Sequence, residues 1–437
     1  MTRLIYLETY GCQMNVADSE LMLGVLAHNG YDQTATPEGA DVILVNTCAV
    51  RDNAEQRVIG RVGELQRHKR PGSVLGVVGC MAQRLGPILL ERVPAVDLVV
   101  GPDGYRNLPE LLAHAGSGER QVDVNYRSWE HYEEIPQLRE TGPTAFVTVQ
   151  RGCDYRCTFC IVPTTRGVER SRRLDDVVCE VRRLADAGTS EVTLLGQTVN
   201  SYHDGDHGFA DLLRAVGAVD GVRRIRFTSP YPTDFTPAVI DAMATTAAVC
   251  EHVHLPVQSG SNAVLRRMLR RYTRERYIEV VAALRAAIPT ITMSTDIIVG
   301  FPGETEDQFE ETMTLVEEAG FDDAYTFKYS VRDGTPAERL RDRVPDVVAS
   351  ERLDRLIERV RGQVRRRNAS RVGAVHEVLV ERPAKRGGMM LARTRQNFLV
   401  LLDVPQTAIG EYRSVRLTGT TGSTFMGSVE QHALAVL

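Results

Sequence analysis

Three cysteines separated by three and by two residues form the most distinctive chemical pattern in the sequence. Cys153, Cys157 and Cys160 directly follow an apolar run that predicts a β-strand. Three close thiolates can each bind one iron of a cubane cluster, which leaves the fourth iron open to a reactant. A tetrahedral zinc site needs a fourth ligand nearby, and neither His nor Cys occurs again before Cys179. The pattern therefore favours an iron–sulfur site with an open position over a zinc site.

Three further cysteines, Cys12, Cys48 and Cys80, lie far apart in the sequence but in equivalent places. Each follows closely on an apolar run that predicts a parallel strand. These runs are residues 4–7, 42–45 and 74–78. Because the carboxyl ends of neighbouring parallel strands share one edge of a sheet, the three thiols can converge there. We expect a second metal site, with three unrelated buried thiols as the alternative.

The elements that must position these cysteines divide the chain into domains. Strand and helix patterns alternate over residues 3–112, which is typical of a parallel sheet covered by helices. A second alternating series, from about 145 to 330, contains six strand–helix units and predicts a full or partial parallel barrel. The predicted fold class is α/β. The expected domains are residues 1–116 (parallel α/β sandwich), 117–144 (linker), 145–370 (partial (β/α)6 TIM-like barrel) and 371–437 (small all-β barrel).

The C-terminal region carries an excess of positive charge. Residues 351–437 contain 15 Lys and Arg against 8 Asp and Glu, whereas residues 1–350 contain 37 against 49. A basic region on an acidic body suggests an anionic partner, and an exposed charged helix is the alternative. A second basic concentration comprises Arg266, Arg267, Arg270, Arg271, Arg274 and Arg276. The small all-β barrel expected at the end of the chain is a scaffold that often binds oligonucleotides.

Composition excludes several classes of protein. The 437 residues are 43% hydrophobic and 25% charged, as in globular proteins, and contain no apolar run of about 18 residues that could span a membrane. The first apolar run is too short for a signal peptide, so we expect a cytoplasmic protein with no membrane partner. In that compartment metal or redox chemistry explains eight cysteines better than disulfides do. We expect the remaining two, Cys179 and Cys250, to pack structurally.

The Cys153, Cys157 and Cys160 motif on the first strand of a β/α barrel resembles that of the radical S-adenosylmethionine (SAM) enzymes. The resemblance implies that these three cysteines are the catalytic set, holding a cluster whose open iron binds SAM. Phe159, directly before the third cysteine, would line the adenine side of SAM, although core packing is an alternative role. The expected SAM-contacting residues after other strands are Gln197, Asn200 and Gln258, in segments that could also be ordinary loops.

The two cysteine triplets in this order resemble the methylthiotransferase branch of that superfamily over essentially the whole chain. The branch combines an N-terminal methylthiotransferase domain, a radical SAM core and a C-terminal TRAM domain, an RNA-binding barrel. The stretch Gly11-Cys12-Gln13-Met14-Asn15 is the form seen in the tRNA enzymes acting on N6-isopentenyladenosine. The stretches 228–230, 254–261 and 327–330 also look like that group. Tyr231 departs from it, because many members carry His there.

This resemblance implies a reaction and its partners. The reaction is methylthiolation of C2 of N6-(dimethylallyl)adenosine at position 37 of tRNA, driven by a 5′-deoxyadenosyl radical. It implies two [4Fe-4S] clusters, held by the six cysteines of the two triplets, and two SAM molecules per turnover. The partners would be the tRNA anticodon loop, an electron-donor protein and a sulfur donor. The TRAM segment 393–398 and the basic C-terminal region would contact RNA, with a hairpin solvated for solubility as the competing view.

Two other functions compete with this one. A methylthiotransferase could instead act on threonylcarbamoyladenosine tRNA or on ribosomal protein S12, but Gln13 and Met14 argue against both. A non-enzymatic metal-cluster protein that binds RNA would contain two closed, redox-inert sites and would not cleave SAM. The open three-thiolate pattern argues against that alternative.

The two cysteine triplets should behave as independent sites. We expect Cys157→Ala to abolish SAM cleavage, because one iron of the radical cluster loses its ligand, and to leave the N-terminal cluster intact. Iron analysis and 5′-deoxyadenosine quantification check this. Simultaneous loss of both clusters would contradict two separate sites.

Overall fold

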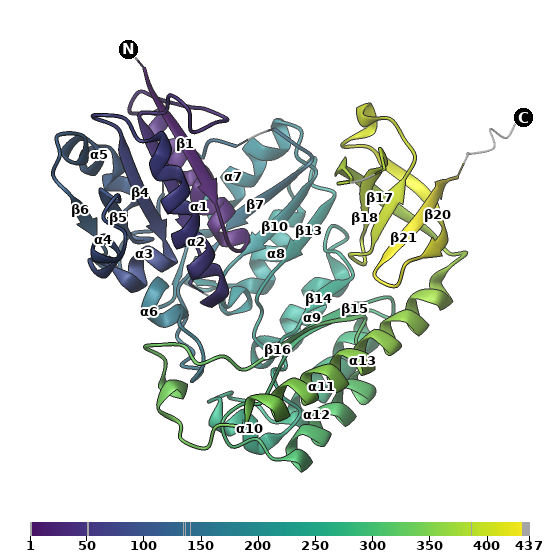
Figure 1. Cartoon of the computed structure of the whole chain (residues 1–437). Helices are drawn as coiled ribbons and strands as arrows, with labels where there is room; N and C mark the ends of the chain where they lie inside the picture. Colours follow the sequence, from purple (N-terminus) through teal and green to yellow (C-terminus); the bar gives the residue numbers. More distant parts are fainter. Residues whose placement is uncertain are drawn as a thin grey trace, which may run out of the picture.

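The computed structural model describes residues 2–49, 52–133, 135, 137–139, 141–385 and 387–430. An N-terminal α/β domain lies beside a central half-barrel, and a long helix leads from the half-barrel to a small C-terminal barrel (Figure 1). No helix in these ranges is both long and apolar enough to cross a membrane.

The N-terminal domain is a parallel sheet of order β2-β1-β3-β4-β5-β6, with apolar cores on both faces. Its strands are β1 (Arg3–Thr9), β2 (Tyr31–Gln33), β3 (Val42–Thr47), β4 (Val74–Gly79), β5 (Leu98–Val100) and β6 (Gln121–Asp123). Its helices are α1 (Gln13–Ala27), α2 (Asp52–Leu65), α3 (Cys80–Leu85), α4 (Ile88–Arg92) and α5 (Leu108–Gly116). The central strands β3 and β4 are buried throughout, which explains their uninterrupted apolar sequences. The predicted parallel α/β sandwich is confirmed.

The segment expected to be a linker completes this sheet. Strand β6 pairs in parallel with β5 although its three residues, Gln-Val-Asp, carry no apolar run that would predict a strand. Further along, Tyr132 is buried in the same core, and its hydroxyl donates a hydrogen bond of 2.6 Å to the Pro102 carbonyl. Residues 121–132 therefore pack as part of the N-terminal domain, because tertiary pairing stabilises a strand too short to show in the sequence.

The central domain is an open half-barrel of six parallel strands. They are β7 (Thr144–Thr148), β10 (Glu191–Leu195), β13 (Arg224–Phe227), β14 (His252–His254), β15 (Thr292–Val299) and β16 (Asp323–Lys328). Its helices are α6 (Val162–Arg166), α7 (Leu174–Asp186), α8 (Phe209–Gly217), α9 (Pro237–Thr245), α10 (Asn262–Arg267), α11 (Arg274–Ala287) and α12 (Glu306–Ala319). A bridge between Ile225 and Val249 joins the sheets β13-β10-β7 and β14-β15-β16. The predicted partial (β/α)6 barrel is confirmed.

The N-terminal domain covers the β7 edge of this half-barrel. Met14 of α1 packs against Leu195 of β10 and Phe146 of β7. Helix α1 therefore brings the strand ends of the N-terminal sheet next to those of the half-barrel.

The basic helix α13 (Asp346–Arg371) finds its anionic partners within the chain. Arg352 and Arg355 both pair with Glu306 at the start of α12. Arg367 and Arg371 both pair with Asp322, which is buried. The charge asymmetry of the sequence thus reflects, in large part, a basic helix lying on an acidic one.

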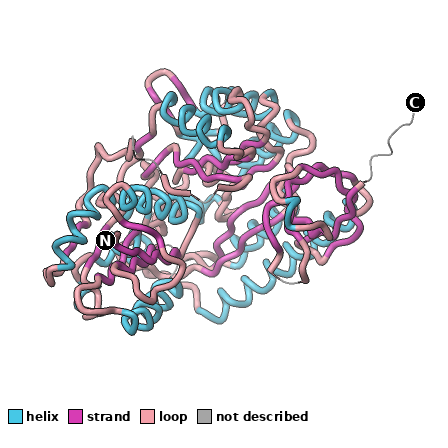
Figure 2. The backbone as a smooth tube through the Cα atoms, turned by 90° about the horizontal axis from the view of Figure 1, so that it is seen from above, coloured by secondary structure: helices cyan, strands magenta, loops and turns pink. Residues whose placement is uncertain are grey.

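The C-terminal domain is a closed five-stranded barrel of order β17-β18-β19-β21-β20 (Figure 2). Its strands are β17 (Val375–Pro383), β18 (Met390–Thr394), β19 (Leu399–Leu402), β20 (Tyr412–Thr420) and β21 (Thr424–Val429). Inward-facing residues such as Val400, Leu417 and Phe425 are fully buried in its core. The predicted small all-β barrel is confirmed.

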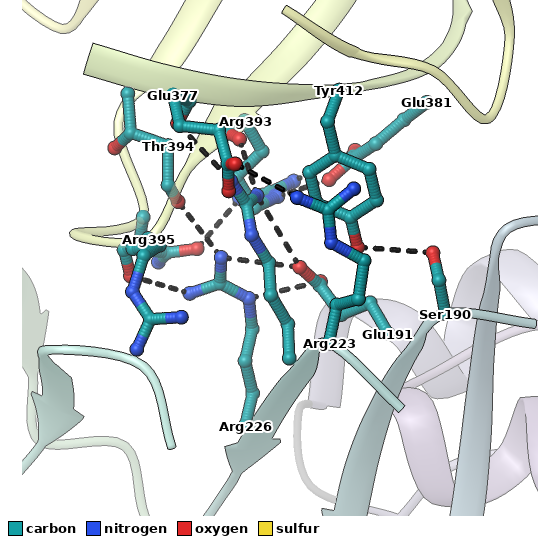
Figure 3. Close-up of polar contacts among 12 residues, drawn as sticks. Ser190, Glu191, Arg223, Arg226, Glu377, Glu381, Arg393, Thr394, Arg395 and Tyr412 are labelled. Atoms are coloured by element: carbon teal, nitrogen blue, oxygen red, sulfur yellow. Dashed lines mark hydrogen bonds and ion pairs between the residues drawn. The ribbon is translucent and has the colours of Figure 1, made fainter. Parts of the chain in front are cut away.

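The hairpin predicted to contact RNA, residues 393–398, faces the half-barrel (Figure 3). Arg226 of β13 donates to the Thr394 and Arg395 carbonyls, at 2.8 and 3.0 Å. Arg395 donates in turn to the Glu251 carboxylate at 2.9 Å. Glu191 accepts from Arg226 at 2.9 Å and lies beneath the barrel. The Arg395 side chain and two hairpin carbonyls therefore join the two domains, whereas Arg393 pairs with Glu381 within the barrel at 2.6 Å.

The charge of Glu191 should be essential to this junction. Its side chain is 4% exposed and lies between the buried guanidinium groups of Arg224 and Arg226. We expect Glu191→Gln to destabilise the folded chain by about 3 kcal/mol, because two buried cations lose their shared anion. Denaturant unfolding measures this, and limited proteolysis should show faster cleavage at residues 372–374. Glu430→Gln, which removes a partly exposed pair with Arg416, serves as the control and should change neither result.

Candidate active site

The first cysteine triplet lies in a loop that can form only with glycine at its start. Gly152 has φ +76°, and a Cβ there would lie 1.9 Å from the Val168 carbonyl oxygen. Gln150, fully buried two residues after β7, accepts from the Gln197 and Thr198 amides at 2.8 and 3.2 Å. This residue was not predicted, although a polar side chain ending an apolar strand is a signal for such a role.

The three thiols of this loop lie close to one another. Cys153 shares a hydrogen bond of 3.0 Å with the Thr198 hydroxyl, and Arg270 donates to the Cys157 sulfur at 3.4 Å. Burial raises the pKa of Cys160 to about 12, and the charges of Cys157 and Cys153 add to the rise. Three adjacent thiolates repel one another, so a bound cationic centre is what would hold all three deprotonated.

The second triplet meets at the carboxyl ends of β1, β3 and β4. Here too, glycines with positive φ precede two of the cysteines, Gly11 (φ +138°) and Gly79 (φ +95°). A Cβ at Gly11 would lie 2.6 Å from the Cys48 Cβ, and one at Gly79 would lie 2.7 Å from the Thr47 carbonyl oxygen. Only glycine allows the strand-end loops to approach so closely.

Buried amides fasten these loops together. Asn15 donates to the Asn46 side chain at 3.0 Å and to the Thr47 carbonyl at 3.2 Å. Asn46 donates back to the Asn15 carbonyl at 2.7 Å and to the Ser19 hydroxyl at 2.9 Å. Both asparagines are fully buried, so the network holds the Cys12 and Cys48 segments in one arrangement.

The thiols of the second triplet influence one another. A hydrogen bond with Cys48 lowers the pKa of Cys12 to about 6 despite the opposing effect of burial, and the charge of Arg166 lowers it further. Burial raises the pKa of Cys80, whose sulfur accepts from Arg166 Nε at 3.0 Å.

Within the described ranges, no group of three or more His, Cys, Asp or Glu side chains could hold a single metal ion. A cubane cluster does not require three ligands on one ion, because each thiolate binds a different iron. The soft sulfur donors of both triplets suit such a cluster.

The two triplets are neighbours across the domain boundary. Ile161, the residue after Cys160, packs against Cys80 and Ala49. Arg332, which follows the last strand of the half-barrel, donates to the Ala49 carbonyl. Residues of the half-barrel thus touch the N-terminal domain next to two of its three cysteines.

The residues predicted to contact SAM have varied surroundings. Phe159 is partly buried and packs against two apolar clusters of the half-barrel. Gln197 accepts from the Gly152 amide, and the Asn200 side chain both donates to and accepts from the Tyr231 backbone, at 2.9 and 2.7 Å. Gln258 has φ +68°, and its backbone bonds to strand β15. Gln197 and Asn200 therefore hold loops in place.

Tyr231, the departure from the family pattern, is part of an aromatic stack beside the first triplet. Its ring lies 3.6 Å from that of Tyr155, nearly parallel to it. The Arg270 guanidinium that reaches Cys157 lies 4.3 Å from the centre of the Tyr231 ring. Tyr231 therefore supports Arg270 through a cation–π contact.

The two cysteines outside the triplets differ. Cys250 is buried, as expected, whereas Cys179 is exposed on α7. The expectation that Cys179 packs structurally was wrong, because the turn of an amphipathic helix on which it lies faces solvent.

Comparison with known proteins agrees with this architecture. The model of the radical SAM superfamily matches residues 147–316, and that described as "Uncharacterized protein family UPF0004" matches residues 4–101. Among solved structures, the radical SAM methyltransferase TsrM from Kitasatospora setae has a TM-score of 0.60 at 16% identity, covering 77% of each chain. The cobalamin-dependent enzyme OxsB has a TM-score of 0.56 at 15% identity, covering 82% of this chain and 56% of that one. Fold and site together define a member of the radical SAM superfamily.

Full-length relatives identify a particular family within this superfamily. The tRNA-2-methylthio-N(6)-dimethylallyladenosine synthase of Chloroherpeton thalassium is 44% identical over 433 residues, covering 97% of this chain and 95% of that protein. Its counterpart in Geobacillus thermodenitrificans is 45% identical over 444 residues, covering 99% and 85%. The chain belongs to the tRNA-2-methylthio-N(6)-dimethylallyladenosine synthase family. The class predicted from the sequence, a tRNA methylthiotransferase of the radical SAM superfamily, is confirmed.

The glycine before Cys80 should be indispensable for the second triplet. We expect Gly79→Ala to destabilise the metal-free protein by about 1–3 kcal/mol, because an L-residue is strained at this φ and meets the Thr47 backbone. Gly63→Ala is the matched control, because a Cβ there meets nothing within 4 Å on α2. That control should leave stability unchanged or raise it by up to about 1 kcal/mol. Denaturant unfolding measures both, and equal stabilities would contradict the argument.

Proposed function

We propose that this chain converts N6-(dimethylallyl)adenosine at position 37 of tRNA into its 2-methylthio derivative, using two [4Fe-4S] clusters and two SAM molecules per turnover. Cys153, Cys157 and Cys160 would hold the cluster that cleaves SAM, and the N-terminal cysteines would hold the second. The observation that carries the proposal is the contact of Ile161, next to Cys160, with Cys80. Chemistry that joins a radical to a sulfur species requires two such sites side by side.

When bound, the first cluster supplies the electron that breaks a C–S bond of SAM and yields a 5′-deoxyadenosyl radical. The chain orients and shields this chemistry. Gln150 and Gln197 hold the loop that starts at Gly152, so the thiols keep one arrangement. Arg270, supported by Tyr231, places a positive charge at Cys157. Ile161 is 3% exposed and excludes water from the boundary between the sites.

For SAM itself, we propose direct contact by Phe159 and Gln258. Phe159 is partly buried in the loop of the first triplet, where a ring can lie against the adenine. Gln258, four residues after β14, has positive φ and bridges to Ile297 of β15 at the half-barrel's catalytic end. Gln197 and Asn200 would contribute to SAM binding indirectly, by holding the loops in which they lie.

The tRNA would approach the open side of the half-barrel. Arg156 and Arg271 are exposed around the first triplet, and Arg271 lies 5.2 Å from the Tyr155 ring. Such residues suit the phosphates of an anticodon loop whose base is unstacked into the site. An electron-donor protein and a sulfur donor complete the reaction, which takes place in the cytoplasm with its tRNA.

Nucleoside mass spectrometry tests this function. Anaerobically reconstituted protein is incubated with isopentenyladenosine-containing tRNA, SAM and a reductant. We expect the 2-methylthio nucleoside from the wild type and from Cys179→Ala, whose thiol lies outside both triplets. Cys157→Ala should form neither this product nor 5′-deoxyadenosine, whereas Cys12→Ala should form 5′-deoxyadenosine alone.

Each other outcome has a definite meaning. SAM cleavage by the wild type without modification of this tRNA would move the substrate to threonylcarbamoyladenosine tRNA or ribosomal protein S12. Absence of SAM cleavage with full iron content would contradict the enzymatic function and favour a cluster protein that only binds RNA.

A further inference from the structure

One arginine connects the two cysteine sites. Arg166 ends α6, the short helix that begins two residues after Cys160, and its side chain crosses into the N-terminal domain. There its Nε donates to the Cys80 sulfur at 3.0 Å. Its side chain is only 4% exposed, so no water screens the contact.

The surroundings of Arg166 leave a positive charge uncompensated. The fully buried carboxylate of Asp18 pairs with Arg166 at 2.7 Å and with Arg151 at 3.0 Å. One carboxylate between two guanidinium groups leaves a net charge of about +1 in the interior, which is costly without a further anion. Arg166 Nη1 and Arg151 Nε are also buried without a hydrogen-bond acceptor in the part of the chain that the structure describes. The nearest anionic centre that could balance this charge is the thiolate site of the N-terminal domain.

We propose that Arg166 is a positioning residue that sets the reduction potential of the N-terminal cluster, acting through Cys80. This inference rests on the proposed function, which places a cluster on Cys12, Cys48 and Cys80. A donor and a positive charge at a ligand sulfur stabilise the reduced, more negative cluster and raise its potential. Because Arg166 is anchored six residues after Cys160, the same side chain also fixes the second site relative to the first.

Lysine could replace only part of this function. The guanidinium group donates to Cys80 through one nitrogen and forms an ion pair with Asp18 through another. An ammonium group on a flexible stem keeps the charge but lacks the rigid fork that reaches both partners. Arg166→Lys should therefore lie between the wild type and Arg166→Gln.

The test isolates the N-terminal cluster in the full-length chain. Cys153, Cys157 and Cys160 are all changed to Ala, the protein is reconstituted with iron and sulfide, and the midpoint potential is measured by redox titration followed by electron paramagnetic resonance. In this background, Arg166→Gln should shift the midpoint to a more negative potential, and Arg166→Lys should shift it less. Arg139→Gln is the matched control, because Arg139 is only 10% exposed and joins Glu20 of α1 to Glu180 of α7 across the same boundary, at 2.7 Å each, in ion pairs that involve neither Arg166 nor a cysteine. Its potential should equal that of the background.

The possible outcomes separate the two proposals. If the background binds no iron, the cluster assignment of the proposed function fails. If Arg166→Gln binds iron and keeps the background potential, the function of Arg166 proposed above is overturned. If Arg166→Gln does not retain iron, the midpoint potential of Asp18→Asn tests the inference instead. Removal of the Asp18 carboxylate leaves more of the Arg166 positive charge to act on Cys80, so the midpoint should move to a more positive potential. An unchanged or more negative midpoint in Asp18→Asn would overturn the inference.

Discussion

The buried carboxylate of Asp18, held between Arg151 and Arg166, is the interaction on which the relation of the two domains depends. Both arginines belong to the segment that surrounds the first cysteine triplet, whereas Asp18 lies on the helix that starts next to Cys12. Burial would raise the pKa of Asp18, but the two guanidinium groups hold it below its ordinary value. The carboxylate therefore stays charged, and separating the domains would expose three unpaired charges. This constraint keeps two sulfur-rich sites within contact of one another.

Backbone shape provides a second constraint. Gly11, Gly79 and Gly152 each directly precede a cysteine of a triplet and each has positive φ. In every case a Cβ would collide with a neighbouring loop. Strand-end loops carry these cysteines, and glycine allows each turn to be sharp enough for thiols from separate loops to meet. Buried side chains such as Asn46 and Gln150 then fasten the loops that the glycines shape.

Several charged side chains of this molecule join its elements to one another. Helix α13 brings its arginines to Glu306 and Asp322, and the C-terminal barrel attaches through Arg226 and Glu191. Both regions looked like RNA-binding elements when only their composition was known. Several of their guanidinium groups form ion pairs within the chain, such as Arg367 with Asp322 and Arg395 with Glu251.

Sequence alone determined the three-domain order, the half-barrel, the small C-terminal barrel and the family. Apolar periodicity and cysteine spacing are local patterns, so they can be read directly from the linear sequence. It also indicated that Cys12, Cys48 and Cys80 share one sheet edge, since parallel topology places strand ends together. Only the tertiary structure decided that residues 121–132 complete the N-terminal sheet and that the hairpin at 393–398 faces inward. The contacts of Arg166 with Cys80 and Asp18 join residues 86 and 148 positions apart. No local pattern encodes such pairs, because the partner of a buried charge is chosen by packing in three dimensions.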